Sequence, residues 1–218
     1  MRFLVPFLFG LTGFAVLVAL GVWQLQRLDW KEGVIAQIEA RITAAPVDLP
    51  PTPDQSADNF LPVRLDARVT GAPLRVLGAW RGGSGYRIVA PVETGGRRVL
   101  VDFGLVPLSA SETTLAPGPY AIIGNLSWPD DVTSATPDPE GSTWFGRDVS
   151  AMADTLGTDP LMVVARTVTP SAGPQPLPVG VEGIPNSHLG YAIQWFGLAL
   201  VWLGMTVFLL WRIRRRTL

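Results

Sequence analysis

The chain contains no cysteine and only one histidine, His188. Without cysteine there are no disulfide bonds and no thiolate metal sites, and without a second histidine a Ser-His-Asp hydrolase site would have to use His188 itself. Charged residues make up only 16% of the chain and the formal net charge is −1, so the sequence offers no basic surface for nucleic acid. The mean hydropathy of +0.30 is high for 218 residues and indicates a membrane protein.

Two apolar segments without a charged residue lie near the ends of the chain, at residues 3–25 and 189–211. Each has about the 20 residues that a helix needs to cross the hydrocarbon core, so we expect transmembrane helices over residues 1–25 and 188–211. Ala19-Leu20-Gly21 is similar to a signal-peptide cleavage site, which makes a cleaved leader the alternative for the first segment. We favour a retained helix, because helical periodicity continues past residue 25.

The two tails carry only basic charge, from Arg2 and from the arginines of a basic tail at residues 212–218, whereas all 18 acidic residues lie between the segments and outnumber the basic residues there. Because basic residues that flank membrane spans stay in the cytoplasm, we expect both termini in the cytoplasm and the central part on the outer side. Arg27 and Lys31 oppose this orientation but are outnumbered by the tail. In a bacterium this would be a multi-pass protein of the inner (cell) membrane with a periplasmic domain.

The sequence after the first span predicts a helix that continues over residues 26–45. Apolar residues recur there at helical spacing: Leu25, Leu28, Val34, Ile35, Ile38 and Ile42. The prolines that begin at Pro46 end the pattern, because proline cannot sustain a helix.

Residues 46–187 predict a β-rich domain. Short runs of β-branched and aromatic residues, separated by glycine or proline, lie at 63–70, 74–80, 86–93, 97–106, 120–128 and 161–168. Gly95-Gly96 predicts a hairpin, and one helix is expected between Asp148 or Ser150 and Gly157. The expected fold class is membrane α+β: a two-helix transmembrane hairpin flanking one exoplasmic, antiparallel β-rich domain, barrel- or sandwich-like, with one helix.

The central domain shows no catalytic motif. The sequence GGSG at 82–85 has neither the spacing of a nucleophile elbow nor the lysine of a phosphate loop, so we interpret it as a turn. The acidic residues at 130–140 lack the spacing of a calcium site and are expected in a solvated loop. A membrane-tethered enzyme would need a pocket that gathers acidic residues such as Asp102, Asp148 and Asp154.

The second span has two different faces. At about 100° per residue, one face carries His188, Tyr191, Trp195, Trp202 and Thr206. The opposite face carries a glycine every seven residues, at Gly190, Gly197 and Gly204. Small residues let helices approach closely in lipid, so we expect the glycine face to pack on the small residues of the first span, which are Gly10, Gly13, Ala15, Ala19 and Gly21.

The aromatic face has two interpretations. In the first, Tyr191 and His188 belong to the aromatic belt at the level of the lipid headgroups, and the deeper indoles of Trp195 and Trp202 simply face lipid. The alternative is a binding face for a flat apolar ligand or a protein partner, because polar residues within a membrane are candidates for function.

A haem is one such ligand. The first helix leaves the membrane on its outer side near Trp23, Arg27 and Trp30, at the same depth at which the second helix enters it at His188. Neutral imidazole is an axial ligand of haem iron, indoles can cover a porphyrin, and Arg27 could pair with a propionate. The pattern permits a haem without requiring one.

Several longer motifs follow one another along the chain: GVWQLQRLDWK, AAPVDLP, GYRIVAPVE, RRVLVDFGLVP, WFGRDVSAMADTLG and NSHLGYAIQWFGLA. They occur in the order seen in the Surfeit-locus family, membrane proteins that assist assembly of cytochrome c oxidase, and the chain resembles this family over almost its whole length. Residues 102–107 depart from the family pattern, which usually has Asn-Arg-Gly-Trp-Val-Pro there, so the roles of that Arg and Trp do not carry over.

The resemblance implies a non-catalytic assembly factor. Bacterial members look like haem a binders that act while haem a enters oxidase subunit I. The family's histidine corresponds to His188, within the pattern formed by Asn186, His188, Tyr191, Ala192, Trp195 and Phe196. The resemblance thus implies His188 as an axial ligand of the haem iron.

The expected function is to hold haem a at the outer face of the membrane and to guide its insertion into subunit I. To His188 we add a ring-covering face of Tyr191, Trp195 and Trp202, with Trp23 nearby and Arg27 as propionate partner. Further expected partners are the machinery that synthesises and delivers haem a, and membrane lipid. The alternative is a cofactor-free scaffold whose aromatic face packs against a helix of subunit I.

Overall fold

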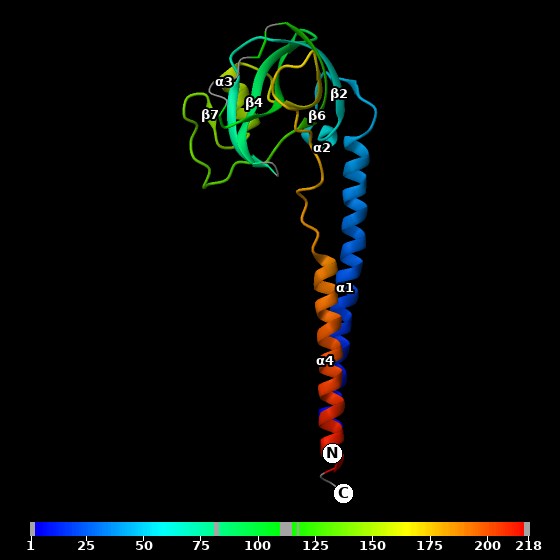
Figure 1. The fold of residues 1–218 in the computed structure, drawn as a ribbon. Coiled ribbons are helices and arrows are strands. Elements are labelled where there is room, and N and C mark those ends of the chain that lie inside the picture. Colours follow the sequence, from blue (N-terminus) through cyan, green and yellow to red (C-terminus); the bar gives the residue numbers. More distant parts are fainter. Residues whose placement is uncertain (1–2, 81–82, 110–114, 117, 216–218) are drawn as a thin grey trace. The chain divides into compact units, whose positions relative to one another are not determined.

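The structure is a computed structural model that describes residues 3–80, 83–109, 115–116 and 118–215. The chain divides into two compact units. One unit is helical and combines Met1–Gln37 with Glu182–Leu218, and the other is the β unit, Ile38–Val181 (Figure 1).

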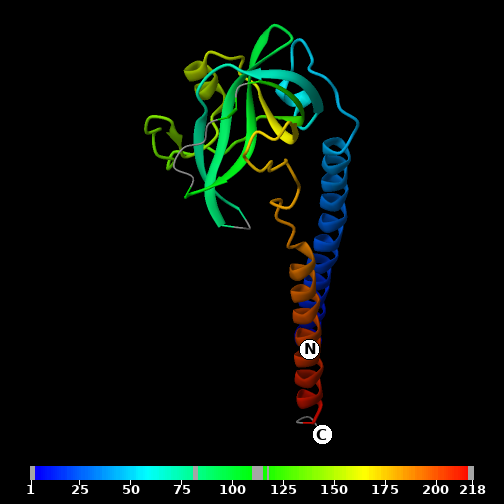
Figure 2. The ribbon, with the colours of Figure 1, turned by 45° about the horizontal axis from the view of Figure 1, so that its top comes forward.

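The helical unit consists of two long antiparallel helices, α1 (Leu4–Ile42), whose last turn belongs to the β unit, and α4 (His188–Arg215) (Figures 1 and 2). Both are long and apolar enough to cross a membrane. Large apolar side chains such as Leu8, Val16 and Leu200 are exposed along them, as expected of surfaces that face lipid. At 1.5 Å per residue, the 39 residues of α1 extend about 58 Å, well beyond a hydrocarbon core of about 30 Å.

The described part of the β unit contains eight strands and two short helices. The strands are β1 (Val47–Asp48), β2 (Pro62–Val69), β3 (Leu74–Trp80), β4 (Gly83–Thr94), β5 (Arg97–Pro107), β6 (Pro119–Ser127), β7 (Thr143–Trp144) and β8 (Met162–Thr169). The helices are α2 (Gln55–Asp58) and α3 (Val149–Leu156). The six longer strands lie where the sequence predicts them, with bounds that shift by a few residues.

The strands form one sheet that closes into a barrel. Their order is β1-β2-β6-β8-β5-β4-β3-β7, and an additional pairing of β2 with β4 joins the two ends of the five-stranded part β2-β6-β8-β5-β4. The predicted fold class is thus confirmed, and of the two expected forms the barrel is the one adopted. The sheet is mixed and not purely antiparallel, because β8 inserts between β6 and β5 and runs parallel to β5.

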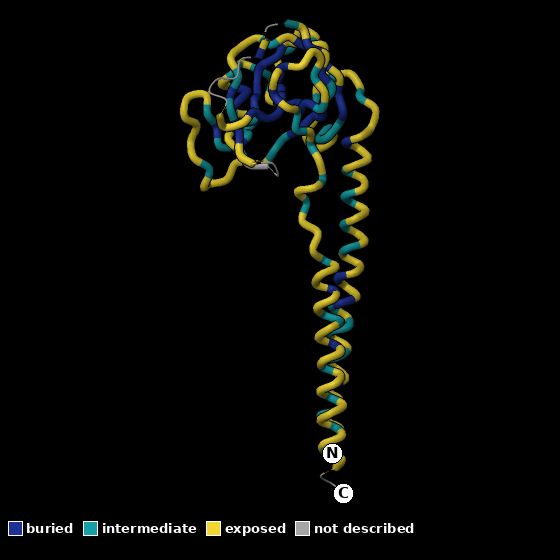
Figure 3. The backbone as a smooth tube through the Cα atoms, in the orientation of Figure 1, coloured by how far each residue is buried: buried dark blue, intermediate teal, exposed yellow. Residues whose placement is uncertain are grey.

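Two apolar clusters lie on the two faces of the barrel wall. The inner cluster draws on all five ring strands and includes Val63, Ile88, Phe103 and Leu126. The outer cluster packs α3 against the sheet and includes Leu100 and Met152. Figure 3 shows this concentration of buried residues in the β unit. Val99, Val101 and Phe103 of β5 enter the inner cluster and Leu100 enters the outer one, so both faces of this strand are buried.

The predicted turn and helix limits are confirmed at two places. Gly95 and Gly96 both have positive φ angles, 55° and 75°, as a tight hairpin turn between β4 and β5 requires. Asp148 caps α3 by accepting a hydrogen bond from the backbone N–H of Ala151, and Gly157 ends the helix in the left-handed conformation.

Two further local features differ from expectation. Gly83 to Gly85 belong to β4 and not to a turn, whereas Gly82 lies outside the described residues. The helix α2 was not expected, because four residues are too few to show periodicity. Its cap is Asp54, whose pKa is lowered from its ordinary value by hydrogen bonds from the Ser56 side chain and from the backbone of Ala57.

Candidate functional site

The two long helices pack by placing large side chains of α4 against glycines of α1. A Cβ atom at Gly10 would collide with Thr206, and one at Gly13 with the indole of Trp202. At Gly21 it would lie 2.7 Å from the ring of Phe196. Trp202 also donates a hydrogen bond from Nε1 to the carbonyl oxygen of Gly10, at 2.9 Å.

The prediction that the glycine face of α4 packs on the first span is therefore wrong. At Gly190, Gly197 and Gly204, no heavy atom of the described chain other than the adjacent residues and the backbone of α4 itself lies within 4 Å of the position that a Cβ would take. The buried small residues of α4 are instead Ala192 and Ala199. Packing the aromatic face inward also gives the Trp202 N–H an acceptor, which lipid would not supply.

His188, the first residue of α4, forms a hydrogen bond with Gln24 of α1. The distance between His188 Nδ1 and Gln24 Oε1 is 2.8 Å. An amide oxygen only accepts, so Nδ1 donates and carries the ring proton, which leaves the lone pair of the imidazole on Nε2. Gln24 has only 9% of its surface exposed, although it lies in an otherwise apolar segment.

The other candidates on α1 lie close to Gln24 in the sequence. Trp23 is the preceding residue and is exposed. Arg27 is three residues further along, one turn beyond Gln24, and its guanidinium lies 3.8 Å from the ring centroid of Trp30. His188 thus lies at the level of Gln24, between Trp23 and Arg27 along the helix.

The candidates on α4 lie at different depths. Tyr191 is exposed one turn from His188, and Trp195 is half-buried two turns away. Trp202 lies about 21 Å along the helix from His188 at 1.5 Å per residue. Its indole packs against Gly13 of α1 and donates to the carbonyl of Gly10, so the structure gives it a packing role between the helices.

Gln24 is the site residue that sequence reasoning missed. A signal for it exists, because it shares one face of α1 with Gly10, Gly13 and Gly21 at about 100° per residue. Glutamine within an apolar span is itself a candidate for function.

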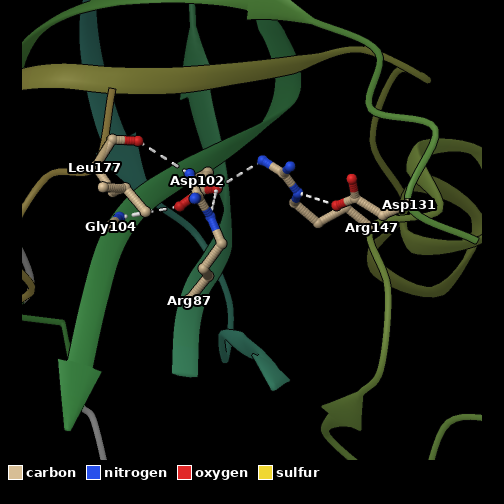
Figure 4. Close-up of polar contacts among 6 residues, drawn as sticks. All are labelled: Arg87, Asp102, Gly104, Asp131, Arg147 and Leu177. Atoms are coloured by element: carbon tan, nitrogen blue, oxygen red, sulfur yellow. Dashed lines mark hydrogen bonds and ion pairs between the residues drawn. The ribbon is translucent and has the colours of Figure 1, made fainter. Parts of the chain in front are cut away.

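A second polar cluster lies in the β unit around Asp102 of β5, which has no exposed surface (Figure 4). Arg87 donates from Nε to Oδ2 at 2.6 Å, and the Gly104 backbone N–H donates to Oδ1 at 3.0 Å. The Nη1 atom of Arg147 lies 3.6 Å from Oδ2. Arg147 also pairs with Asp131, and Arg87 donates to the carbonyl of Leu177.

This cluster does not form the acidic pocket that an enzyme would need. Asp102 forms ion pairs with arginines, Asp148 caps α3, and Asp154 is exposed. Within the described ranges, no group of three or more His, Asp or Glu side chains could hold a metal ion. The contacts of Asp102 thus join strands β4 and β5 to the segments around residues 147 and 177.

Comparison with known proteins gives one consistent result. A sequence model of the SURF1 family matches residues 11–200. The chain is 29% identical over 215 residues to Surfeit locus protein 1 of Rattus norvegicus, covering 84% of this chain and 69% of that protein. It is 29% identical over 212 residues to Surfeit locus protein 1 of Homo sapiens, covering 83% and 69%. A SURF1-like protein of Monosiga brevicollis is 28% identical over 220 residues, covering 89% and 83%.

Proposed function

Because the chain belongs to the SURF1 family of cytochrome c oxidase assembly factors, we propose that it binds haem a at the outer face of the membrane that it spans and assists the insertion of haem a into oxidase subunit I. The observation that carries the proposal is the hydrogen bond between His188 and Gln24. In this role haem a is a cargo that the protein passes on, and the redox chemistry of haem a takes place in the oxidase.

The donor set around His188 fits a haem iron. Histidines that bind metals commonly donate the other ring N–H to a hydrogen-bond acceptor, which fixes the tautomer and the ring orientation. Gln24 is such an acceptor, and it leaves the Nε2 lone pair for the iron. An interfacial belt alone does not account for a buried glutamine that pairs with the histidine.

The remaining residues have supporting roles in the proposal. His188 supplies the axial nitrogen, Tyr191 and Trp195 cover the ring on α4, and Trp23 adds an indole on α1. Arg27, one turn beyond Gln24, pairs with a propionate by charge-assisted hydrogen bonds. Trp202 contributes indirectly, by holding α4 against α1.

A single histidine suits transfer better than permanent storage. The chain has no second histidine and no cysteine, so among its imidazoles and thiolates His188 alone would hold the iron. A single protein ligand would leave the iron open to a ligand from the receiving subunit.

We further propose that both termini lie in the cytoplasm and that the β unit lies outside, in the periplasm if the source is bacterial. Arg212, Arg214 and Arg215 at the end of α4 support this orientation. Arg2 and Arg216, which add to the same charge asymmetry, lie outside the described residues.

The test is the absorption spectrum of the detergent-purified protein after co-expression with the enzymes of haem a synthesis. The wild type is expected to show bound haem a, and His188→Ala is expected to lose the spectrum or shift it. The Ser187→Ala variant, which changes the preceding exposed residue, is the matched control and should retain the wild-type spectrum. A spectrum that His188→Ala leaves unchanged would refute the role of His188.

A cofactor-free scaffold for subunit I is the second candidate function. The glycine face of α4 favours it, because Gly190, Gly197 and Gly204 lie away from α1 and allow another helix to approach closely. Colourless wild-type protein that still co-purifies with subunit I would support the scaffold over the haem a carrier.

A further inference from the structure

We propose that Gln24 positions His188 and tunes its strength as a ligand, by holding the imidazole with the proton on Nδ1 and Nε2 directed to the iron. The proposal rests on the haem a binding proposed above. It assigns a function to a buried polar residue that neither the family match nor the packing of the helices explains.

The burial of Gln24 requires a reason. An amide without a hydrogen-bond partner is unfavourable in an apolar environment, and an apolar residue would fill the same space without that cost. Gln24 is 9% exposed and meets His188 across the two helices, 164 residues away in the sequence. The partner that compensates its burial is the side chain proposed to bind the iron.

The position of Gln24 is well suited to orient a ring. His188 is the first residue of α4 and follows a segment without helix or strand. Gln24 lies inside a continuous helix, one turn from Gly21, where Phe196 of α4 is seated. A residue on a rigid element holds a ligand more accurately than one on a loop.

The same hydrogen bond changes the electron density of the ring. An acceptor at Nδ1–H increases the basicity of the imidazole and strengthens its bond to a metal. A stronger acceptor than the amide favours oxidised iron and lowers the reduction potential. Loss of the acceptor has the opposite effect.

The experiment compares four full-length proteins in detergent: wild type, Gln24→Leu, Gln24→Glu and Gln26→Leu. Gln26 is an exposed glutamine on the same helix and provides the matched control. Each purified apoprotein is titrated with haem a to obtain the Kd, and the reduction potential of each complex is measured. Near-ultraviolet circular dichroism verifies that the tertiary structure is retained.

We expect Gln24→Leu to weaken haem a binding about 10–100-fold, the range typical of residues that orient a metal ligand. Gln24→Glu, which keeps an acceptor oxygen, should retain binding and lower the potential, while Gln26→Leu should match the wild type. A change of potential in this direction would not follow from altered helix packing alone.

The inference is overturned if folded Gln24→Leu binds haem a with the wild-type Kd and potential, whereas the proposed function then stands. If the leucine variant does not fold, the Gln24→Glu protein still tests the inference. A reduction potential of its haem a complex equal to that of the wild type also overturns the inference. Wild-type protein that binds no haem a refutes the proposed function itself and the inference with it.

Discussion

At the residue scale, Asp102 is a carboxylate with no exposed surface whose partners come from separate parts of the chain. Arg87 lies 15 residues earlier, on the neighbouring strand β4, and Arg147 lies just before α3. Removing one partner of a buried ion pair leaves the other charge uncompensated, which costs more than the pair itself contributes.

We predict that Asp102→Ala lowers the free energy of unfolding by about 3–5 kcal/mol. Urea unfolding of the full-length protein in detergent, followed by tryptophan fluorescence, measures this change. The matched control is Asp66→Ala on the exposed face of β2, expected to change stability by less than about 0.5 kcal/mol. Equal effects of the two substitutions would show that the arginine contacts contribute little.

His188 could be singled out from the sequence because it is the single histidine and begins the second span. Gln24 could not be paired with it in advance, since the pairing depends on how α1 and α4 are rotated about their axes. The ion pairs of Asp102 were equally inaccessible, because β-strand periodicity does not reveal which distant arginine faces a buried carboxylate.

At the scale of elements, the contact between α1 and α4 joins large side chains on one helix to glycines on the other. The glycines of α4 were expected to meet the small residues of α1, whereas the structure shows Thr206 against Gly10. Composition identifies the faces of a helix, but the fit of side-chain shapes decides which face is covered.

A cysteine pair tests this packing directly, because the chain has no native cysteine. We predict that Gly10→Cys with Thr206→Cys forms a disulfide rapidly in membranes under mild oxidation. A Cβ at Gly10 would lie 3.0 Å from the Cβ of Thr206, somewhat closer than the roughly 3.5–4.5 Å of a disulfide, so a small separation of the two helices brings the pair into range. The control pair, Gly10→Cys with Gly204→Cys, should stay reduced; faster cross-linking of the control would mean that the glycine face meets α1 after all.

The strands were predictable for a different reason. Each long strand carries its own pattern of β-branched and aromatic residues, bounded by glycine or proline, so local sequence is sufficient. The parallel pairing of β5 with β8 was not predictable, because Leu100 and Met162 become partners only through a long connection that includes α3. The two-residue strands β1 and β7 are too short to show any pattern.

At the scale of the whole molecule, composition already separates a membrane part from a β-rich part. Charged residues are confined to the regions outside the two apolar segments, and the structure forms long helices from those segments and a barrel from the sequence between them. Closure of the barrel, through Arg68 and Val69 of β2 opposite Glu93 and Val92 of β4, depends on pairings between distant strands. The sequence therefore indicates the fold class but leaves the choice between barrel and sandwich open.

The haem a content of the oxidase is the most direct test of the proposal that His188 binds haem a for insertion into subunit I. Cells of the source organism that lack this gene are complemented with the wild type or with His188→Ala, and haem a per subunit I is determined in the purified oxidase. We expect His188→Ala, present in the membrane at the wild-type level, to restore no more haem a than an empty vector. A full complement of haem a with His188→Ala would contradict the proposal and favour the cofactor-free scaffold.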